Sequence, residues 1–271
     1  MISALGIVII LCLAFYLFLI APRRQRRQQW PDGFFQHDFA HRGLYGGSVP
    51  ENSLTAFQLA VNKGYGIELD VQLTADGELA VHHDASLLRT CGVDRKISEM
   101  TAGEIRRYPL GENGESVPFF QEVLELVHGQ APLIVELKTA GRRNPELARK
   151  AYETLRRYGG NWVVESFDPR LMRWFRKNAP QVIRGQLAYD PRLGGPPGDG
   201  KKYVFLADLL MNFISRPDFV AYCHETDSNL SFRLLRRLFR PVLAAWTVQD
   251  TDTCQRLRSQ YDQQIFEGFE P

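Results

Sequence analysis

The stretch Ile67-Glu68-Leu69-Asp70-Val71 decides the fold, because it alternates apolar and acidic residues with a period of two. Successive side chains of a β-strand point to opposite faces, so this stretch predicts a strand with one apolar face and one acidic face. Two carboxylates side by side repel each other, which favours an arrangement around a bound cation. The alternative is an exposed sheet edge whose acids are solvated.

Outward from this stretch, short apolar runs alternate with amphipathic helical stretches, which is typical of a protein built from βαβ units. Eight runs have the composition of strands, over residues 37–41, 66–71, 78–83, 133–137, 162–167, 183–187, 218–222 and 242–248. The predicted helices cover residues 54–63, 101–108, 119–127, 145–158, 169–177, 206–214, 230–239 and 251–261. The pattern favours an α/β fold, a distorted, TIM-like (β/α)8 barrel, over an open doubly wound sheet.

Two features predict that the barrel is irregular. The pair Asp76-Gly77 joins the second and third predicted strands by too few residues for a helical crossover, so it predicts a hairpin turn. A ninth apolar run, over residues 264–266, is a candidate for the true last strand.

Composition excludes some functions and leaves others open. The chain has 271 residues, 44% of them hydrophobic and 24% charged, which is enough for one substantial core or two small ones. Its formal charge is only +2, so nothing predicts nucleic acid as a partner. The four cysteines lie far apart without C-x-x-C spacing, which favours a reduced compartment over a zinc site or a disulfide framework.

The first 20 residues contain no charged side chain and predict one transmembrane helix, because 20 residues at about 1.5 Å each span the hydrocarbon core of a bilayer. A secretory signal is the alternative, but the segment lacks a basic amino-terminal region and a small-x-small cleavage site. We therefore expect a transmembrane anchor over 1–22, a basic juxtamembrane linker over 23–36 and a catalytic barrel over 37–271.

Four arginines flank only the carboxyl side of the predicted span: Arg23, Arg24, Arg26 and Arg27. Basic clusters beside a span tend to stay in the cytoplasm, so we expect a single-pass protein in the membrane with its barrel on the cytoplasmic side. The lipid bilayer is thus a predicted partner, and the arginines could equally bind anionic headgroups.

A second strand carries charge on one face. In 133–138 the alternation places Glu136 and Lys138 together near the carboxyl end of the strand, where barrels have their active sites. A third carboxylate there would complete an oxygen site suited to Mg²⁺ or Ca²⁺, and the Lys138 ammonium could bind a phosphate oxygen. The alternative is a surface Glu/Lys pair.

Histidines follow two of the predicted strands, His41 after the first and His83 after the third. An imidazole can give or take a proton near neutral pH, so two of them can act as acid and base on a phosphodiester, although either alone is more often structural. Arg42 offers a planar donor fork for phosphate, and Gly43 lets the chain turn closely past it.

The order of these motifs resembles the glycerophosphodiester phosphodiesterase family. The resemblance runs from about Phe39 to Val248 and is carried by His41-Arg42-Gly43, Pro50-Glu51-Asn52-Ser53, Glu68-Leu69-Asp70-Val71-Gln72-Leu73-Thr74, Asp76-Gly77, His83-Asp84, Glu136-Leu137-Lys138, Ser166-Phe167 and Trp246-Thr247-Val248. It implies a distorted barrel that cleaves glycerophosphodiesters into an alcohol and glycerol phosphate with a divalent metal ion.

The resemblance also implies roles for individual residues. It implies an acid/base pair of His41 and His83, metal ligands Glu68, Asp70 and Glu136, and phosphate contacts from Arg42 and Lys138. Glu51, in a family motif, is expected near the metal at the substrate site, and Trp246 is expected either to line the pocket or to pack in the core. The chain departs from the family at its end, which reads Ile265-Phe266-Glu267-Gly268 where members usually have Ile-Thr-Asp-x-Pro.

Three functions remain open at this stage. The first is hydrolysis of deacylated phospholipids, and the second is a lysophospholipase D that uses the same residues on lysophospholipids at a membrane. The third is an anchored binding protein without turnover.

Overall fold

The computed structural model describes residues 3–23, 30–111, 114–194 and 205–271. The strands in these ranges are β1 Phe39–Ala40, β2 Gly66–Leu73, β3 Leu79–Val81, β4 Pro109–Leu110, β5 Glu115–Ser116, β6 Leu133–Leu137, β7 Trp162–Ser166, β8 Arg184–Ala188, β9 Phe219–Cys223, β10 Val242–Val248 and β11 Gln263–Phe266. The helices are α1 Ala4–Ile20, α2 Leu54–Lys63, α3 Leu88–Cys91, α4 Ala102–Ile105, α5 Phe120–Val127, α6 Asn144–Leu155, α7 Pro169–Asn178, α9 Asn212–Ser215, α10 Leu230–Leu238 and α11 Thr251–Leu257. Short 3-10 turns are η2 Phe34–Gln36, η3 Ile97–Glu99, η4 Gly141–Arg143 and η5 His224–Thr226.

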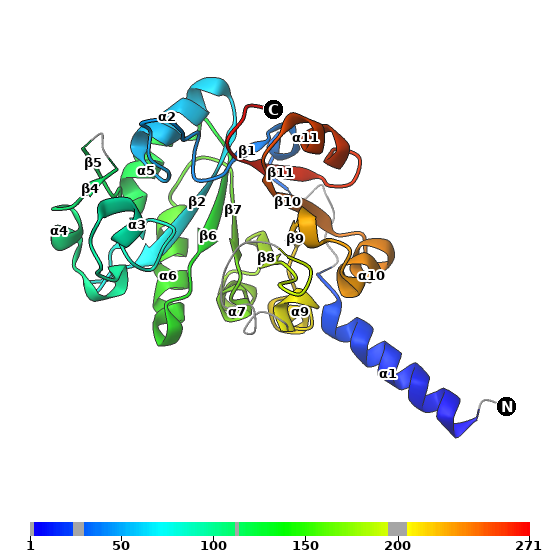
Figure 1. The fold of residues 1–271 in the computed structure, drawn as a ribbon. Coiled ribbons are helices and arrows are strands. Elements are labelled where there is room, and N and C mark those ends of the chain that lie inside the picture. The colour runs from blue at the N-terminus through cyan, green and yellow to red at the C-terminus, as the bar shows by residue number, and fades with distance from the viewer. Residues whose placement is uncertain (1–2, 24–29, 112–113, 195–204) are drawn as a thin grey trace.

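Eight parallel strands close into a barrel. They follow the order β1-β11-β10-β9-β8-β7-β6-β2, and β1 also pairs with β2, so the sheet has no free edge between these two strands. Helices such as α2, α6, α7, α10 and α11 lie outside the strands (Figure 1). The predicted (β/α)8 architecture is confirmed.

One predicted barrel strand is replaced by another. The segment that contains β3 pairs antiparallel with β2, with Val71 opposite Val81, and Asp76-Gly77 lies in the turn, as predicted for a hairpin. The strand predicted over 78–83 is therefore present as β3, but an antiparallel hairpin partner does not count among the eight parallel barrel strands. The ninth run takes its place, because β11 pairs in parallel with both β1 and β10.

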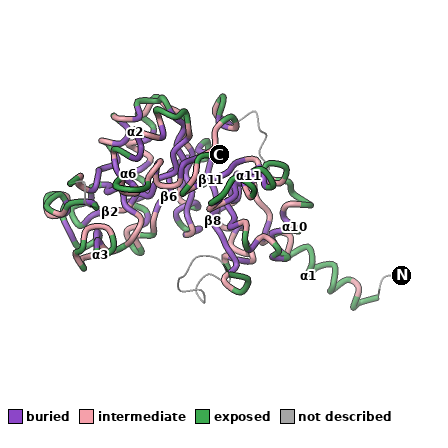
Figure 2. Tube along the Cα trace, turned by 45° about the horizontal axis from the view of Figure 1, so that its top comes forward, coloured by how far each residue is buried: buried purple, intermediate pink, exposed green. Residues whose placement is uncertain are grey.

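The barrel interior is filled at the amino-terminal ends of the strands. An apolar layer there includes Trp30, Phe34, Phe39, Ile134, Val163, Phe219, Val242 and Ile265. Two glycines make room for its rings, because a Cβ on Gly66 would lie 2.6 Å from the Phe39 ring and one on Gly185 only 2.2 Å from the Phe219 ring. This layer is the floor of the barrel, and Figure 2 shows the strands around it as buried.

The floor also includes part of the predicted linker. Residues 24–29 of the segment 23–36 lie outside the described ranges, whereas Trp30 and Phe34 are buried and their rings lie 5.2 Å apart between centroids. Phe34 packs in turn on Phe39 of β1, at 5.0 Å. The end of this segment therefore contributes to the barrel core.

The amino-terminal helix α1 is shorter than predicted. It has 17 residues, because Ser3 caps its first turn and Pro22 disfavours helical geometry at Ala21. At about 1.5 Å per residue it is roughly 26 Å long, below the thickness of a hydrocarbon core. Within the described ranges, no helix combines the length and the apolar character needed to cross a bilayer. The predicted membrane span over 1–22 is therefore corrected to a 17-residue apolar helix.

The carboxyl end of α1 is docked on the barrel, and the helix projects from it beside α9 (Figure 1). The Asn212 amide donates to the Ile20 carbonyl at 2.9 Å, and the Arg216 guanidinium donates to the carbonyls of Phe18 and Ala21 at 3.0 and 2.7 Å. These bonds satisfy carbonyls that a helix end leaves without a partner in the helix.

Candidate active site

Strand alternation places the candidate site directly above the floor. On β2, the apolar Ile67, Leu69 and Val71 face the surrounding helices, whereas Glu68 and Asp70 face the barrel interior. The residues at the carboxyl ends of the other strands line the same cavity, which has a volume of about 1090 Å³. The cavity therefore lies where (β/α)8 barrels have their active sites.

Three carboxylates converge at one point of this cavity. Glu68 and Asp70 come from β2, and Glu136 comes from β6, where it pairs in register with Asp70. One oxygen of each lies within 4.8 Å of the others, and all three residues are at most 7% exposed. The structure thus brings together the three predicted metal ligands.

These carboxylates strongly perturb one another. Burial raises the pKa of Glu68 well above its ordinary value, and the charges of Asp70 and Glu136 raise it further. Burial also raises the pKa of Glu136, to about 7, against the opposing effect of Lys138. Burial would raise the pKa of Asp70 as well, but the Lys138 ammonium and other nearby cations hold it well below the usual range.

The geometry fits a divalent cation. Oxygens that lie about 2.0–2.6 Å from one Mg²⁺ or Ca²⁺ ion can be at most about 5 Å apart, and the three carboxylates meet this limit. Buried carboxylates at such separations repel unless positive charge lies among them. A set made only of oxygen donors suits Mg²⁺ or Ca²⁺ rather than zinc or copper.

Lys138 supplies part of that positive charge. Its Nζ lies 2.8 Å from Asp70 Oδ1 and 2.7 Å from Glu136 Oε2. Both carboxylates raise the pKa of Lys138, although burial alone would lower it. The ammonium therefore holds two of the predicted ligands, while it still lines the cavity that was predicted to receive phosphate.

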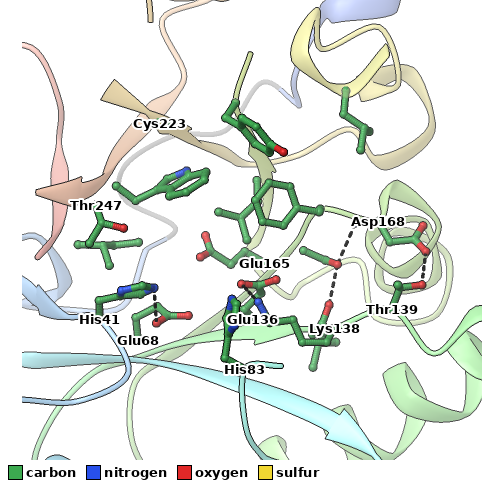
Figure 3. A pocket seen from close by; sticks show the side chains of 18 of the residues that line it. His41, Glu68, His83, Glu136, Lys138, Thr139, Glu165, Asp168, Cys223 and Thr247 are labelled. Carbon is green, nitrogen blue, oxygen red and sulfur yellow. Dashed lines mark hydrogen bonds and ion pairs between the residues drawn. The ribbon is translucent and has the colours of Figure 1, made fainter. Parts of the chain in front are cut away.

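His41, directly after β1, is oriented by the carboxyl end of the chain. Its Nδ1 lies 2.6 Å from Glu267 Oε2, and its Nε2 lies 3.9 Å from Glu68 Oε2. Tyr45 and Gln249 also donate to the Glu267 carboxylate, at 2.8 and 2.7 Å. Burial lowers the pKa of His41, and the Glu267 carboxylate opposes that shift. Figure 3 shows the contact of His41 with Glu68 and that of Lys138 with Glu136.

His83 follows β3 and lines the same cavity. Its Nδ1 lies 2.7 Å from Asp84 Oδ1, and burial lowers its pKa to about 4. His82 is instead structural, since its ring nitrogens bond the Asp84 carbonyl and the Thr90 hydroxyl at 2.8 and 2.6 Å. Of the two adjacent histidines, the one predicted to be catalytic faces the cavity.

Arg42 and Glu51 form a second layer behind the carboxylates. The Arg42 backbone, at a φ of +56°, turns its N–H toward Glu68 Oε2 at 3.1 Å. Its guanidinium donates to Glu51 Oε1 at 2.9 Å, and its Nε lies 3.5 Å from Asp70 Oδ2. Glu51 also receives two bonds from Arg89, at 2.8 and 2.7 Å. The structure places Glu51 among arginines, whereas Arg42 lines the cavity.

The opposite side of the cavity is aromatic. Trp246 of β10, which was predicted to line the pocket or the core, lines the cavity together with Phe167, after β7, and Tyr189, after β8. Two of the three rings are partly exposed and Tyr189 is buried. The mouth therefore has a charged side, on β1, β2, β3 and β6, and an aromatic side, on β7, β8 and β10.

Two site residues were missed from the sequence. Glu165 of β7 pairs in register with Glu136, is 1% exposed and lines the cavity (Figure 3). Burial raises the pKa of Glu165 well above its ordinary value, and the charge of Glu136 raises it further. The alternation in 162–166 was a usable signal for it. Glu267 was missed because the closing strand was identified only as a candidate.

Together these features define a class of protein: a (β/α)8 barrel with a buried acidic triad and two imidazoles at its mouth. A family model described as "Glycerophosphoryl diester phosphodiesterase family" matches residues 41–262. The protein YhdW of Bacillus subtilis strain 168 is 32% identical over 229 residues, which are 81% of this chain and 89% of that protein. The chain belongs to the glycerophosphoryl diester phosphodiesterase family.

Further relatives agree with this assignment. A glycerophosphodiester phosphodiesterase of Bacillus altitudinis is 36% identical over 163 residues, which cover 56% of this chain but only 66% of that protein's length. The crystal structure of a glycerophosphodiester phosphodiesterase from Thermotoga maritima matches with a TM-score of 0.65 and 26% identity, over 85% of this chain and 94% of that one. A phosphodiesterase of Oleispira antarctica, solved with its product sn-glycerol-3-phosphate, has the same fold, with a TM-score of 0.69, 21% identity, and coverage of 85% and 92%.

Proposed function

We propose that this chain hydrolyses glycerophosphodiesters to an alcohol and glycerol phosphate with the help of a divalent cation. The observation that carries the proposal is the convergence of three buried carboxylates within 4.8 Å, with the imidazoles of His41 and His83 lining the same cavity. Family membership supports the reaction class. The arrangement supplies charge neutralisation and proton transfer, which phosphodiester hydrolysis requires.

Glu68, Asp70 and Glu136 would hold Mg²⁺ or Ca²⁺. When bound, such an ion polarises a phosphoryl oxygen and neutralises charge that develops on it. Arg42 and Lys138 add two fixed positive charges at the same end of the cavity. Glu51 holds the Arg42 guanidinium, and Asp70 and Glu136 hold the Lys138 ammonium.

The two imidazoles have different surroundings, which support different roles. With its pKa lowered to about 4, His83 is neutral at pH 7 and can accept the proton of the attacking hydroxyl. Burial lowers the pKa of His41, but the Glu267 carboxylate 2.6 Å from Nδ1 opposes that shift and orients the ring, so His41 is placed to hand a proton to the departing alkoxide. Glu267 acts here as a positioning residue, as the carboxylate does in a His–carboxylate pair.

The test is turnover by the purified full chain on a small panel of glycerophosphodiesters. We expect release of glycerol phosphate and the free alcohol, loss of release in chelator, and recovery on addition of Mg²⁺ or Ca²⁺ alone. Absence of turnover on every diester tried, including a chromogenic p-nitrophenyl diester, would support a binding protein without turnover.

A lysophospholipase D is a second candidate, supported by the apolar residues of the cavity wall. Leu187, Leu206 and Met211 line the cavity, and its volume of about 1090 Å³ exceeds that of a glycerophosphodiester headgroup. An acyl chain could pack against these side chains. Release of lysophosphatidic acid from a lysophospholipid, compared with release of glycerol phosphate from the deacylated substrate, separates the two activities.

For α1 we propose association with a lipid bilayer. Its side chains are apolar all round and largely exposed, with Leu11 at 62% and Phe15 at 63%. An apolar surface of this kind favours a lipid environment. Sedimentation with vesicles should fall in the double variant Leu11→Glu, Phe15→Glu, and unchanged sedimentation would contradict the proposal.

We also propose that the barrel lies on the cytoplasmic side of that membrane. The support is the sequence itself, in which basic residues follow α1 and none precedes it. A reporter fused after Pro271 that is active only when exported would contradict this orientation.

A further inference from the structure

The guanidinium of Arg89 joins two carboxylates that come from different parts of the chain. Its Nε donates to Asp84 Oδ2 at 2.6 Å, and its two terminal nitrogens donate to the Glu51 carboxylate at 2.8 and 2.7 Å. Asp84 follows β3, whereas Glu51 lies between β1 and α2. All three guanidinium nitrogens are therefore engaged, in a planar fork that a lysine cannot reproduce.

Each of these carboxylates contacts one residue of the candidate site. Asp84 Oδ1 lies 2.7 Å from His83 Nδ1, and Glu51 Oε1 accepts from the Arg42 guanidinium at 2.9 Å. The contacts form a continuous series that runs His83, Asp84, Arg89, Glu51, Arg42. The two ends of this series line the cavity, whereas Arg89 and its two carboxylates lie behind the cavity wall.

The charges of the series fit the proposed role of His83. Burial would raise the pKa of Asp84, but hydrogen bonds from Arg89 and His83 hold it at about 2. Burial would likewise raise the pKa of Glu51, and hydrogen bonds and charges of Arg89 and Arg42 lower it instead. Because an ionised Asp84 can only accept, the proton of the neutral His83 ring lies on Nδ1, and Nε2 is the nitrogen that can take a proton.

The backbone that carries Arg89 is fixed on both sides. Leu87 is buried, and the Thr90 hydroxyl lies 2.6 Å from His82 Nε2. The Gly111 N–H donates to the Thr90 carbonyl at 2.9 Å. The position of α3 is therefore set by packing and by His82, although the Arg89 side chain itself is 50% exposed.

We propose that Arg89 is a positioning residue that orients two groups of the site at once: His83 through Asp84, and Arg42 through Glu51. The inference rests on the proposed function, in which His83 accepts a proton and Arg42 contacts phosphate. Without the fork, Asp84 loses its guanidinium and Glu51 keeps Arg42 as its remaining partner, so both contacts can shift. A displacement of about 1 Å in a reacting group can cost about 100-fold in rate.

The first test separates the two branches by kcat and KM. Asp84→Asn should lower kcat with little change in KM, and Glu51→Gln should chiefly raise KM. Arg89→Ala should do both and lower kcat/KM by about 100-fold, and Arg89→Lys should show most of the same loss. The matched control is Arg95→Ala, which removes a half-exposed arginine paired with Glu104 at 3.0 Å. We expect the control to keep kcat and KM within about twofold.

The second test asks whether Arg89 acts through these two carboxylates. In a chain that already carries Asp84→Asn and Glu51→Gln, the further change Arg89→Ala should cost less than about threefold in kcat/KM, because residues that act through one another are not additive. An undiminished loss in that background would mean that Arg89 acts by another route and would overturn the inference. Where Arg89→Ala lowers the Tm, Arg89→Lys carries the same comparison.

A binding measurement keeps the inference independent of turnover. Calorimetric titration with glycerol phosphate in Mg²⁺ should show a Kd about tenfold weaker in Arg89→Ala and in Glu51→Gln, since the phosphate loses a well-placed charged donor. Asp84→Asn and Arg95→Ala should leave this Kd unchanged.

The outcomes distinguish the inference from the proposed function. If no diester is cleaved but the Kd values follow this pattern, Arg89 positions Arg42 and the proposed hydrolysis fails. If the unmodified chain cleaves diesters, and both Arg89 variants keep its kcat, KM and Kd, the hydrolase stands and the positioning role is overturned. Absence of both turnover and glycerol phosphate binding in the unmodified chain overturns both.

Discussion

The charged and aromatic sides of the barrel mouth follow the same strand alternation and carry different chemistry. On the charged side, Asp70, Glu136 and Lys138 hold one another at 2.7–2.8 Å, and His41 is held by Glu267. On the aromatic side, ring planes are set by packing at 5.7–6.2 Å. The difference teaches that ion pairs set the geometry on the charged side, where the proposed reaction needs it, whereas ring packing sets the geometry on the aromatic side.

The largest expected effect is on the charged side. Glu68→Gln removes one negative oxygen from the triad, and we expect kcat to fall by at least about 10³-fold. The fall should be equal for choline and p-nitrophenyl esters, because the alcohol does not reach this carboxylate. Glu78→Gln, an exposed carboxylate of the hairpin turn, is the matched control. A fall in kcat that differed strongly between the two esters would contradict the assignment of Glu68 to the phosphate end of the site.

Variants of the two histidines test whether the charged side contains one proton donor and one proton acceptor. His41→Ala should lower kcat by about 10²- to 10⁴-fold on an alkyl diester, and by much less on a p-nitrophenyl diester, whose phenolate leaves without a proton. His83→Ala should lower both by a similar factor, because both substrates need an activated hydroxyl. Parallel rate measurements on the two substrates decide this, and the reverse pattern would exchange the two roles.

Glu267 should have an intermediate effect. Glu267→Gln keeps the shape but removes the charge that faces His41 Nδ1, and we expect a loss of about 10- to 100-fold in kcat with little change in KM. Glu267→Asp should restore part of the activity, since it retains the carboxylate. An equal loss in both variants, with a lowered Tm, would indicate a purely structural role.

The smallest expected effect is on stability. The pKa of Glu136 is raised to about 7, so the folded protein without metal holds this proton more tightly than the unfolded chain does. The contribution of this proton to the free energy of unfolding is fully present below about pH 4.3 and is lost as the pH rises to about 7. A bound cation removes this loss, so the gain in Tm from Mg²⁺ over chelator should be larger at pH 8 than at pH 5. A gain that shrinks with pH would contradict the assignment.

The sequence predicted the charged side better than the rest for a physical reason. Glu68 and Asp70 sit in a long strand whose alternation is unambiguous, and Glu136 sits in the strand that pairs beside it. Alternation could not tell which of His82 and His83 faces the cavity, because β3 ends at Val81 and the period of two applies only within a strand. The resemblance to a family is what selected His83 rather than His82.

Closure of the barrel was harder to predict. Residues 78–83 and 264–266 are both short apolar runs, and only the tight turn at Asp76-Gly77 distinguishes the hairpin strand from the closing strand. Glu267 was missed together with this closure. The perpendicular packing of the rings was also outside the reach of the sequence, since it depends on tertiary contacts between three strands.

The packed floor has a consequence for the order of events at the site. With Phe39 and Phe219 seated against Gly66 and Gly185, the described residues leave no route through the bottom of the barrel. In the proposed reaction, substrate and both products would enter and leave through the mouth of the barrel. Glycerol phosphate, held deeper by the cation at the carboxylates, would leave after the alcohol. Glycerol phosphate should compete with incoming substrate, whereas the free alcohol should inhibit without full competition.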